Sequence, residues 1–208
     1  MDIFCYPFAR GRLFLEQEID KNQYSNAQQC FWASGTALIV RKKLFLESGE
    51  FEEIFFAHME EIDLCWRLQA MGHEIWVEPR SLVYHKNAVS LPMNSHKKYY
   101  LNHRNSLIMI FSNYSILITL YLGSLRLILE LIACMYTLLK FDFNHFTGIV
   151  KSIIWILLHP LQIIKKRSRF KKIKRVSDKQ IMRMLTKDSI VLQHYFFRKK
   201  TYLEIVSK

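Results

Sequence analysis

The residues best suited to chemistry are three carboxylates within four positions, Glu60, Glu61 and Asp63. Apolar residues recur at helical spacing from Met59 onward, so these carboxylates fall in a first helical turn, where the helix dipole stabilises negative charge. On that helix Glu60, Asp63 and Arg67 share one face, and Glu61 is turned about 100° away from Glu60. One carboxylate can therefore be ion-paired while its neighbour faces a cleft as a general base. The alternative is a structural charge cluster with an intrahelical ion pair.

Two further groups of residues are of types that bind ligands. His85 stands at the end of a predicted strand, where it is either a ligand or a structural histidine. Trp32, Ser34 and Gly35 precede a predicted buried strand. A tryptophan offers an aromatic platform to the face of a sugar, and a glycine lets the backbone approach a ligand closely. Packing in the core is the alternative role of Trp32.

The elements that position these residues are predicted to mix α and β structure. Short runs of β-forming residues predict strands, and helical periodicity closed by a glycine predicts helices. The prediction is an ordered loop over residues 1–30, strands over 36–40, 74–77 and 81–85, and helices over 41–48, 59–70 and 97–112. Gly49 and Gly72 end the first two helices. We therefore expect an α/β fold in the first 114 residues.

Charge divides the chain into two unlike halves. Residues 1–114 carry 12 basic and 13 acidic side chains, whereas residues 115–208 carry 18 basic and 5 acidic ones. Half of all residues are hydrophobic and 23% are charged, which excludes a disordered tail protein. We expect a first domain over 1–114, an apolar helical segment over 115–164 and a basic helical tail over 165–208.

Two apolar runs, 116–139 and 149–164, dominate the second half. The first is long enough to span a bilayer, but it carries Arg126 and Glu130. Each of these charges costs about 2.5–3.5 kcal/mol near a membrane centre, unless the two pair across one helical turn. The second run is broken by Pro160. We favour helices that lie in the membrane interface, and the alternatives are a two-pass hairpin and a helical cap on the soluble part.

Eight basic residues lie within the eleven positions from Lys165 to Arg175. Behind an apolar helix, such a run suits the anionic lipids of a cytoplasmic leaflet, at about 1 kcal/mol per charge. Its single aromatic residue, Phe170, argues against a nucleic-acid partner. The four cysteines have no metal-binding spacing, which indicates reduced thiols in the cytosol, and the first residues lack the pattern of a signal peptide.

The ordered set of motifs up to His85 resembles family 2 glycosyltransferases of the GT-A fold, especially bacterial enzymes that build cell-surface polysaccharides. That family has Ser-Gly-Ala before a strand, then Arg, Gly-Gly-Phe, Phe-Phe, Glu-Asp-x-Asp-Leu-Cys-x-Arg, Gly-Tyr and a strand ending in Tyr-His. The matching residues here are, in order, Trp32 to Thr36, Arg41, Gly49 to Phe51, Phe55 and Phe56, Glu60 to Arg67, Gly72 and His73, and Tyr84 and His85. The resemblance covers residues 1–114. It implies a partial GT-A-like mixed sheet with flanking helices, followed by a membrane-associated helical region.

The resemblance also implies a role for each candidate residue. Glu61 stands where the family has the catalytic aspartate that deprotonates the acceptor hydroxyl, and Glu60 is the preceding acidic residue that helps to hold the acceptor. His85 corresponds to the histidine that joins a divalent cation, Mg²⁺ or Mn²⁺, beside the nucleotide diphosphate. The residues predicted to bind substrate are Trp32, Ser34, Gly35, Asp63 and Arg67. The implied reaction is a displacement at the anomeric carbon with inversion.

The sequence departs from the family pattern at the base and, more seriously, upstream of Trp32. The base is a glutamate, one methylene longer than aspartate. Only 31 residues precede Trp32, and no Asp-x-Asp occurs, although the family has a nucleotide-binding half there. We therefore expect an acceptor-side portion, truncated or from a split gene, that needs a separate N-terminal half to supply the nucleotide-sugar site and its metal.

The function that these observations predict is an inverting glycosyltransferase of cell-surface polysaccharide synthesis. The expected partners are a nucleotide-sugar donor, a saccharide or lipid-linked acceptor and an anionic membrane surface, at the cytoplasmic face of the bacterial inner membrane. The alternative is a non-catalytic membrane-associated remnant or scaffold protein. The absent Asp-x-Asp is the feature that separates these two hypotheses.

Overall fold

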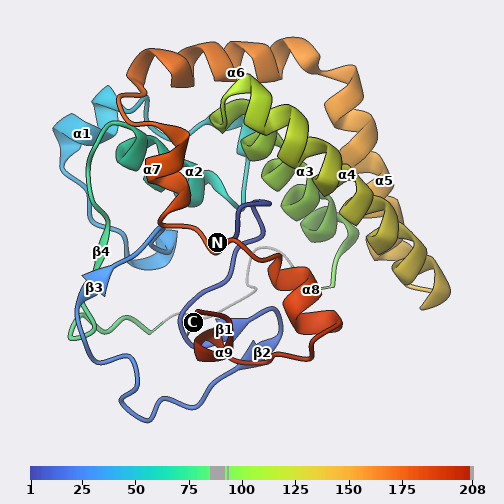
Figure 1. The fold of residues 1–208 in the computed structure, drawn as a ribbon, viewed down its shortest axis with the longest axis horizontal. Helices are drawn as coiled ribbons and strands as arrows, with labels where there is room; N and C mark the ends of the chain where they lie inside the picture. Colours follow the sequence, from blue (N-terminus) through green and yellow to red (C-terminus); the bar gives the residue numbers. More distant parts are fainter. Residues whose placement is uncertain (85–91, 93, 207–208) are drawn as a thin grey trace.

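The computed structural model describes residues 1–84, 92 and 94–206, which are mostly helical with two small sheets (Figure 1). The strands are β1 (Arg12–Leu13), β2 (Glu16–Gln17), β3 (Gln28–Gln29) and β4 (Trp76–Val77). The helices are α1 (Lys42–Glu47), α2 (Glu60–Ala70), α3 (His96–Asn113), α4 (Ile116–Leu139), α5 (Phe143–Leu158), α6 (Pro160–Ile173), α7 (Asp178–Met182), α8 (Ile190–Tyr195) and α9 (Tyr202–Val206). Two 3-10 turns are η1 (Gly35–Ala37) and η2 (Glu53–Phe55).

Each sheet is an antiparallel pair of two-residue strands. β1 pairs with β2, with Leu13 opposite Glu16, and β3 pairs with β4, with Gln29 opposite Trp76. Within the described residues these are the two sheets that form. The described residues therefore do not form the expected mixed sheet of GT-A type. Their β structure is limited to two small antiparallel pairs beside a helical body.

The predicted buried strand over 36–40 is wrong. Residues Gly35–Ala37 form η1, and the residues that follow it pair with no strand of the described chain. Ile39 is 97% exposed. A strand needs neighbours to satisfy its backbone N–H and C=O groups, so β-forming residues without a partner strand take another conformation. Residues 81–84 likewise form no strand, and His85 lies outside the described residues.

The predicted helices of the first half are confirmed. Helix α1 ends before Gly49, whose φ is +87°, and α2 ends before Gly72, whose φ is +94°. Both glycines occupy the left-handed region that favours a residue without a Cβ atom. Helix α3 matches the predicted 97–112 segment within one residue at each end. Helix α2 carries Glu60 and Glu61, and α3 contacts the loop before them.

Helix α3 lies at the centre of the helical body and packs against α4, α5 and α6 (Figure 1). Helix α5 approaches α3 closely at Gly148, where an added Cβ would lie 3.0 Å from the Tyr100 backbone nitrogen and from the Tyr99 Cβ. Any larger residue at this position would force the two helices apart. Glycine therefore sets the spacing between α3 and α5.

The two charges of α4 face the protein interior and pair, as the sequence spacing predicts. Arg126 Nε donates to Glu130 Oε1 at 2.9 Å, and Arg126 Nη2 donates to Ser106 Oγ at 2.8 Å. The other carboxylate oxygen of Glu130 lies 2.7 Å from His103 Nδ1. Because Arg126 and Glu130 are almost fully buried, the outer face of α4 is left to apolar side chains.

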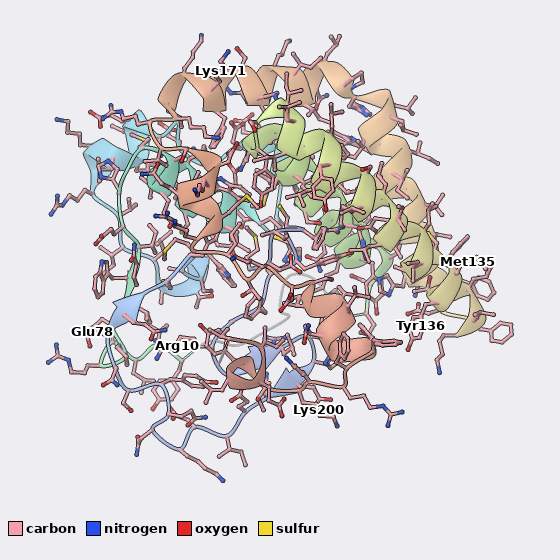
Figure 2. All side chains as sticks on the ribbon, viewed as in Figure 1. Arg10, Glu78, Met135, Tyr136, Lys171 and Lys200 are labelled. Atoms are coloured by element: carbon pink, nitrogen blue, oxygen red, sulfur yellow. The ribbon has the colours of Figure 1, made fainter. Side chains whose placement is uncertain are left out.

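The outer faces of α4 and α5 are strongly apolar. Exposed large side chains on α4 include Leu117, Leu120, Leu131, Ile132, Met135, Tyr136 and Leu139. Figure 2 shows Met135 and Tyr136 extending from the far end of α4. By length and composition α4 is able to cross a membrane, and α5 with α6 passes the same test as a pair bent by 74°. The bend falls at Pro160, as the sequence predicts, because proline begins a new helix there.

The main core joins all three predicted segments of the chain. Its buried side chains include Phe55 and Trp66 from the first segment, Leu122 from the second and Phe170 from the third. Trp66 packs edge-on against Tyr114 with ring centroids 4.9 Å apart. The boundaries at 114 and 164 stay a prediction. The four cysteines are free thiols, three of them buried.

Candidate active site

The loop that enters α2 has an unusual backbone conformation. Phe56, His58 and Met59 have φ values of 62°, 65° and 73°, in the left-handed region that costs a non-glycine residue of order 1–3 kcal/mol. Glu60 and Glu61 follow directly as the first residues of α2. Backbone strain persists only where the surroundings impose it, and it concentrates at functional sites. The strained loop therefore marks the start of α2 as a candidate site.

Two buried side chains of α3 hold the strained loop in place. Asn105 Nδ2 lies 2.7–3.0 Å from three loop carbonyl oxygens, those of Phe55, Ala57 and His58. Arg104 Nη2 donates to the Phe55 carbonyl at 2.9 Å, and Arg104 Nε donates to Asn105 Oδ1 at the same distance. These hydrogen bonds supply the free energy that maintains the strain. Arg104 and Asn105 are thus positioning residues for the start of α2.

Glu61 has the environment of a general base. Its side chain is partly buried, and its Oε2 atom is buried with no hydrogen-bond partner among the described residues. Burial and the neighbouring negative charge of Glu60 raise the pKa of Glu61 to about 7. A carboxylate with a pKa near the working pH, and with an uncommitted oxygen, can accept a proton from a hydroxyl. Glu60 Oε2 is also buried and has no partner in the described chain.

The structure brings Gly35 and Glu61 together although they are 26 positions apart in sequence. A Cβ atom at Gly35 would lie 3.6 Å from the Glu61 Cβ and 3.8 Å from its Cγ. Ser34 is exposed and caps η1, with its hydroxyl accepting from the Thr36 N–H at 3.4 Å. The backbone at Gly35 therefore lies against the aliphatic part of the Glu61 side chain. Contact of these residues with a substrate stays a prediction.

Trp32 lies between two clusters of apolar side chains. It is half-buried and packs against the main core and against the smaller cluster around Leu64, Cys65 and Leu68. This contact is the core-packing role that the sequence left open. The contact of its remaining surface with a sugar stays a prediction.

Asp63 belongs to the core rather than to the surface of the site. Its carboxylate is 0% exposed: Oδ2 accepts from Arg67 Nε at 2.8 Å, and Oδ1 accepts from Lys166 Nζ at 2.7 Å and from Asn113 Nδ2 at 2.9 Å. Burial alone would raise the pKa of Asp63, but the two cations outweigh it and hold that pKa below its usual value. The charged carboxylate therefore ties α2 to α3 and α6.

Arg67 is equally buried and holds the segment after α1. Its Nη1 donates to the Ser48 carbonyl at 2.5 Å, and its Nη2 donates to the Glu50 carbonyl at 2.6 Å. All three guanidinium nitrogens are thus engaged with the protein itself. In this structure Asp63 and Arg67 support α2 from inside, and the substrate contact predicted for them remains a prediction.

The predicted metal ligand, His85, lies outside the described residues. Among the residues that the structure does describe, no three His, Cys, Asp or Glu side chains gather in a group that could hold a metal ion. The described residues therefore do not by themselves fit a resident divalent cation.

Sequence reasoning missed two features of the site. The first is the hold of Arg104 and Asn105 on the strained loop, which periodicity cannot indicate because the partners are backbone carbonyls about 50 positions away. The second is the pairing of Lys166, which lies within the basic run, with Asp63. A signal for the first exists in hindsight: two polar residues stand on the apolar face of a predicted helix.

Comparison with known proteins gives a short match. Over 56 residues, 26% of this chain, the sequence is 38% identical to N-acetylglucosaminyl-diphospho-decaprenol L-rhamnosyltransferase of Mycobacterium tuberculosis strain CDC 1551 / Oshkosh. The likeness is to a sugar transferase. The protein of the same name from strain ATCC 25618 / H37Rv matches to the same extent, and the matched stretch spans only 18% of the length of each relative.

No family model and no solved structure matches the chain. The comparisons therefore support a partial, glycosyltransferase-like resemblance. Assignment to family 2 and to the GT-A fold is carried by the motifs alone.

Proposed function

We propose that this chain carries the acceptor side of an inverting glycosyltransferase, with Glu61 as the base that deprotonates the acceptor hydroxyl. The observation that carries the proposal is the environment of Glu61: a raised pKa of about 7, a buried oxygen without a partner, and a strained loop held by Arg104 and Asn105. The short likeness to a rhamnosyltransferase supports the same class of reaction.

The proposed reaction is a single displacement at the anomeric carbon of a nucleotide-sugar. The acceptor oxygen forms the new bond to that carbon while the bond to the diphosphate breaks on the opposite face, and the acceptor proton passes to a carboxylate oxygen of Glu61. The negative charge of Glu60 raises the proton affinity of Glu61. The proposal places the acceptor beside the Glu61 side chain, which Gly35 approaches so closely that a Cβ at Gly35 would lie 3.6 Å from the Glu61 Cβ.

The donor side of the reaction has to come from outside the described residues. The proposal assigns the nucleotide-sugar, and the Mg²⁺ or Mn²⁺ that His85 is expected to join, to a site completed by a separate N-terminal half. Such an ion would stabilise the leaving diphosphate. No role in the chemistry of the described residues depends on it.

We further propose that the protein binds the anionic lipid surface at the cytoplasmic face of a bacterial inner membrane. One helix long and apolar enough to span a membrane, and exposed basic side chains at the end of α6, support this association. The charges of Arg126 and Glu130 face inward, so the outer face of α4 can contact acyl chains without burying an unpaired charge.

The test is sugar transfer in membranes of the native host, which contain any partner that the chain needs. Membranes that contain either the wild-type chain or the Glu61→Gln variant are incubated with a panel of radiolabelled nucleotide-sugars. The radioactivity incorporated into the lipid-linked saccharide fraction is then measured. We expect Glu61→Gln to lower transfer by about 10²–10⁴-fold, the usual contribution of a general base. Glu47→Gln, an exposed change on α1, is the matched control and should retain transfer.

The second candidate is a non-catalytic membrane-associated scaffold. The feature that separates it from an enzyme complete in one chain is the Asp-x-Asp motif, which the sequence does not contain. If transfer in host membranes is the same with Glu61→Gln as with the wild type, the scaffold role replaces the proposed one.

A further inference from the structure

Helix α4 is bound to the rest of the protein along its whole length. Its buried residues follow helical spacing and therefore form one stripe, from the first turn of the 24-residue helix to the last. They are Thr119, Leu122, Gly123, Arg126, Glu130, Cys134 and Thr137. A helix held in this way moves only together with the parts of the chain that hold it.

The partners of this stripe belong to the first 114 residues. Arg126 Nη1 donates to the Phe4 carbonyl at 2.5 Å, and the Arg126 guanidinium lies 3.6 Å from the ring centroid of Tyr6. One turn later, Glu130 Oε2 lies 2.7 Å from His103 Nδ1 of α3. The charged residues of the apolar helix are thus fixed to the N-terminal loop and to the central helix of the body.

The body that holds α4 is too polar to enter a bilayer. Helix α3 carries Lys97 and Arg104 among other polar residues, and charged side chains are costly in hydrocarbon. If α4 crossed a membrane with its partners, α3 would follow it into the acyl chains. If α4 crossed alone, its buried charges would lose their contacts with Phe4 and His103. Both routes are unfavourable, which favours a helix that lies along a membrane surface.

The opposite face of α4 is exposed and apolar. Its large exposed side chains include Leu117, Leu120, Ile128, Leu131 and Met135. The only charged residues in the sequence of α4 are Arg126 and Glu130, and both are buried. A helix with one face bound to protein and the other face apolar over its whole length is suited to lie in the plane of a membrane interface.

The apolar surface continues from α4 onto α5 and α6. Helices α4 and α5 pack against each other and against α3, and Figure 1 shows α5 and α6 along the outer edge of the helical body. A surface groove of about 360 Å³ at the bend between α5 and α6 is lined by apolar residues of all three helices. They include Ile116 and Leu120 of α4, Ile156 of α5, and Ile163 and Ile164 of α6. The three helices therefore share one apolar surface.

Charged residues border this apolar surface. Lys140 follows α4 and is exposed, and α6 exposes Lys165 and Lys171 beyond its apolar first turn. Lys151, the only Lys, Arg, Asp or Glu in the sequence of α5, lies 5.0 Å from the ring centroid of Tyr100 on α3. Lysines at the edge of an apolar face can reach anionic headgroups while the face contacts acyl chains.

We propose that α4 and α5 lie in the plane of one leaflet of anionic phospholipid and that neither helix crosses the bilayer. The acyl region of that leaflet covers the exposed face of α4, and the protein is attached from one side. This inference rests on the proposed membrane association, to which it adds the orientation of the helices. It does not depend on sugar transfer.

The test is a depth profile of α4 in lipid vesicles. Leu120→Cys, Ile128→Cys and Met135→Cys are made in the full chain, at positions exposed near the start, the middle and the end of the helix. All variants carry Cys30→Ser, since Cys30 is the one cysteine that is not buried. Each cysteine is labelled with bimane, and the vesicles contain phosphatidylglycerol with phosphatidylcholine brominated near the headgroup or near the chain end. Ile39→Cys, at a position that is 97% exposed, is the matched control.

We expect the three labels on α4 to lie at equal depth. The ratio of quenching by the two brominated lipids should then agree within about twofold among them, and the Ile39 label should not be quenched. A ratio that shows Ile128 more than about twofold deeper than both Leu120 and Met135 would reveal a helix that crosses, and it would overturn the proposal. Absence of quenching at all three positions in the bound protein, as a second copy on this face would cause, would also overturn it.

The side of the membrane on which α4 ends gives a second measurement. Phe141 lies in the turn between α4 and α5 and is 78% exposed. Phe141→Cys and Lys43→Cys on α1 are treated with a membrane-impermeant maleimide, in spheroplasts and in inside-out vesicles of the host. We expect both to react from the same side of the membrane. Reaction from opposite sides would mean that α4 crosses.

These measurements and the transfer assay can fail independently. Labels at equal depth without Glu61-dependent transfer would keep the membrane arrangement and remove the proposed enzyme. Glu61-dependent transfer by a chain whose α4 crosses the bilayer would keep the enzyme and remove this inference. A chain that binds no vesicles would remove the proposed membrane association, and this inference with it.

Discussion

Lys166 and Asp63, 103 positions apart in sequence, form a buried ion pair in which Lys166 Nζ lies 2.7 Å from Asp63 Oδ1. Lys166 is only 1% exposed, although it stands within a run of eight basic residues. The ion pair joins α6 to α2, the helix that carries Glu60 and Glu61. A basic segment that resembles a membrane-binding tail in sequence thus also supports the candidate site.

The rest of the basic run is divided between protein contacts and the surface. Arg167 donates to the Phe111 and Tyr114 carbonyls, Arg169 pairs with Glu52 at 2.6 Å, and Lys174 pairs with Asp178. Lys165, Lys171, Lys172 and Arg175 are exposed. Figure 2 shows Lys171 at the outer edge of the molecule on α6. The sequence prediction of eight lipid-facing charges is therefore wrong for Lys166, which is sealed in the core.

Replacing Lys166 should destabilise the fold strongly. Lys166→Met removes one partner of a buried ion pair and leaves Asp63 with less compensation, so we expect the free energy of unfolding to fall by about 3–5 kcal/mol. Lys165→Met, next to it on the exposed side of α6, is the control and should change stability by less than about 0.5 kcal/mol. Chemical denaturation of both variants measures this, and equal stability of the two would contradict the buried pair.

Replacing Asn105 should release the strained loop. Asn105→Leu leaves the Ala57 and His58 carbonyl oxygens without this donor, at an expected cost of about 2–4 kcal/mol. Hydrogen exchange of the amides of residues 55–61 should become faster. Asn102→Leu, a half-buried position on the same helix, is the control. Unchanged exchange in the Asn105 variant would mean that the loop holds its conformation by other contacts.

The pKa of Glu61 predicts a pH dependence of stability. Burial and the charge of Glu60 raise the pKa of Glu61 from an ordinary value near 4.5 to about 7. Between pH 4.5 and pH 7 the folded protein therefore keeps a proton on Glu61 that the unfolded chain has lost. Stability should therefore fall as the pH rises through this window, by at most about 3 kcal/mol from this group.

Glu61→Gln removes that titration and is the variant that isolates it. Its stability should decline less than that of the wild type between about pH 4.5 and pH 7, with the largest gain above pH 7. Burial also raises the pKa of Asp2, to about 6. Asp2 is present in both proteins, so its contribution cancels in the comparison. Parallel stability curves for the two proteins would contradict the raised pKa.

The exposed basic residues of α6 and its C-terminal end should attach the protein to anionic lipid. We expect at least about a tenfold loss of binding to phosphatidylglycerol vesicles when four charges near the surface are neutralised. The variant changes Lys165, Lys171, Lys172 and Arg175 to Gln, and the control changes Lys21, Arg41, Lys42 and Lys43 to Gln. Vesicle co-sedimentation measures both, and an equal loss in the control would indicate a general charge effect instead of a surface on α6.

Local patterns predict helices well in this chain and strands poorly. The limits of α3 and α4 follow from apolar patterns, and that of α2 also from the glycine after it, all of which are properties of nearby residues. Residues 36–40 have the composition of a strand, but whether a strand forms depends on partners that composition does not reveal. Arg126 and Glu130 are four residues apart on one helix, so their ion pair could be predicted from the sequence. The ion pair of Asp63 with Lys166 depends on the tertiary fold.

The candidate site was predictable in type and not in detail. The clustering of Glu60 and Glu61 at a helix start indicated acid–base chemistry. Their neighbours in space could not be derived, since the approach of Gly35 and the hold of Asn105 come from distant parts of the chain.

The central claim, that Glu61 accepts the proton of the acceptor, is tested most directly by comparing Glu61→Asp with Glu61→Gln in the host-membrane transfer assay. Aspartate keeps the carboxylate one methylene shorter, whereas glutamine keeps the size and removes the basicity. The account predicts that the aspartate variant transfers sugar at least about tenfold faster than the glutamine variant. Equal transfer by the two variants, at any level, would contradict it.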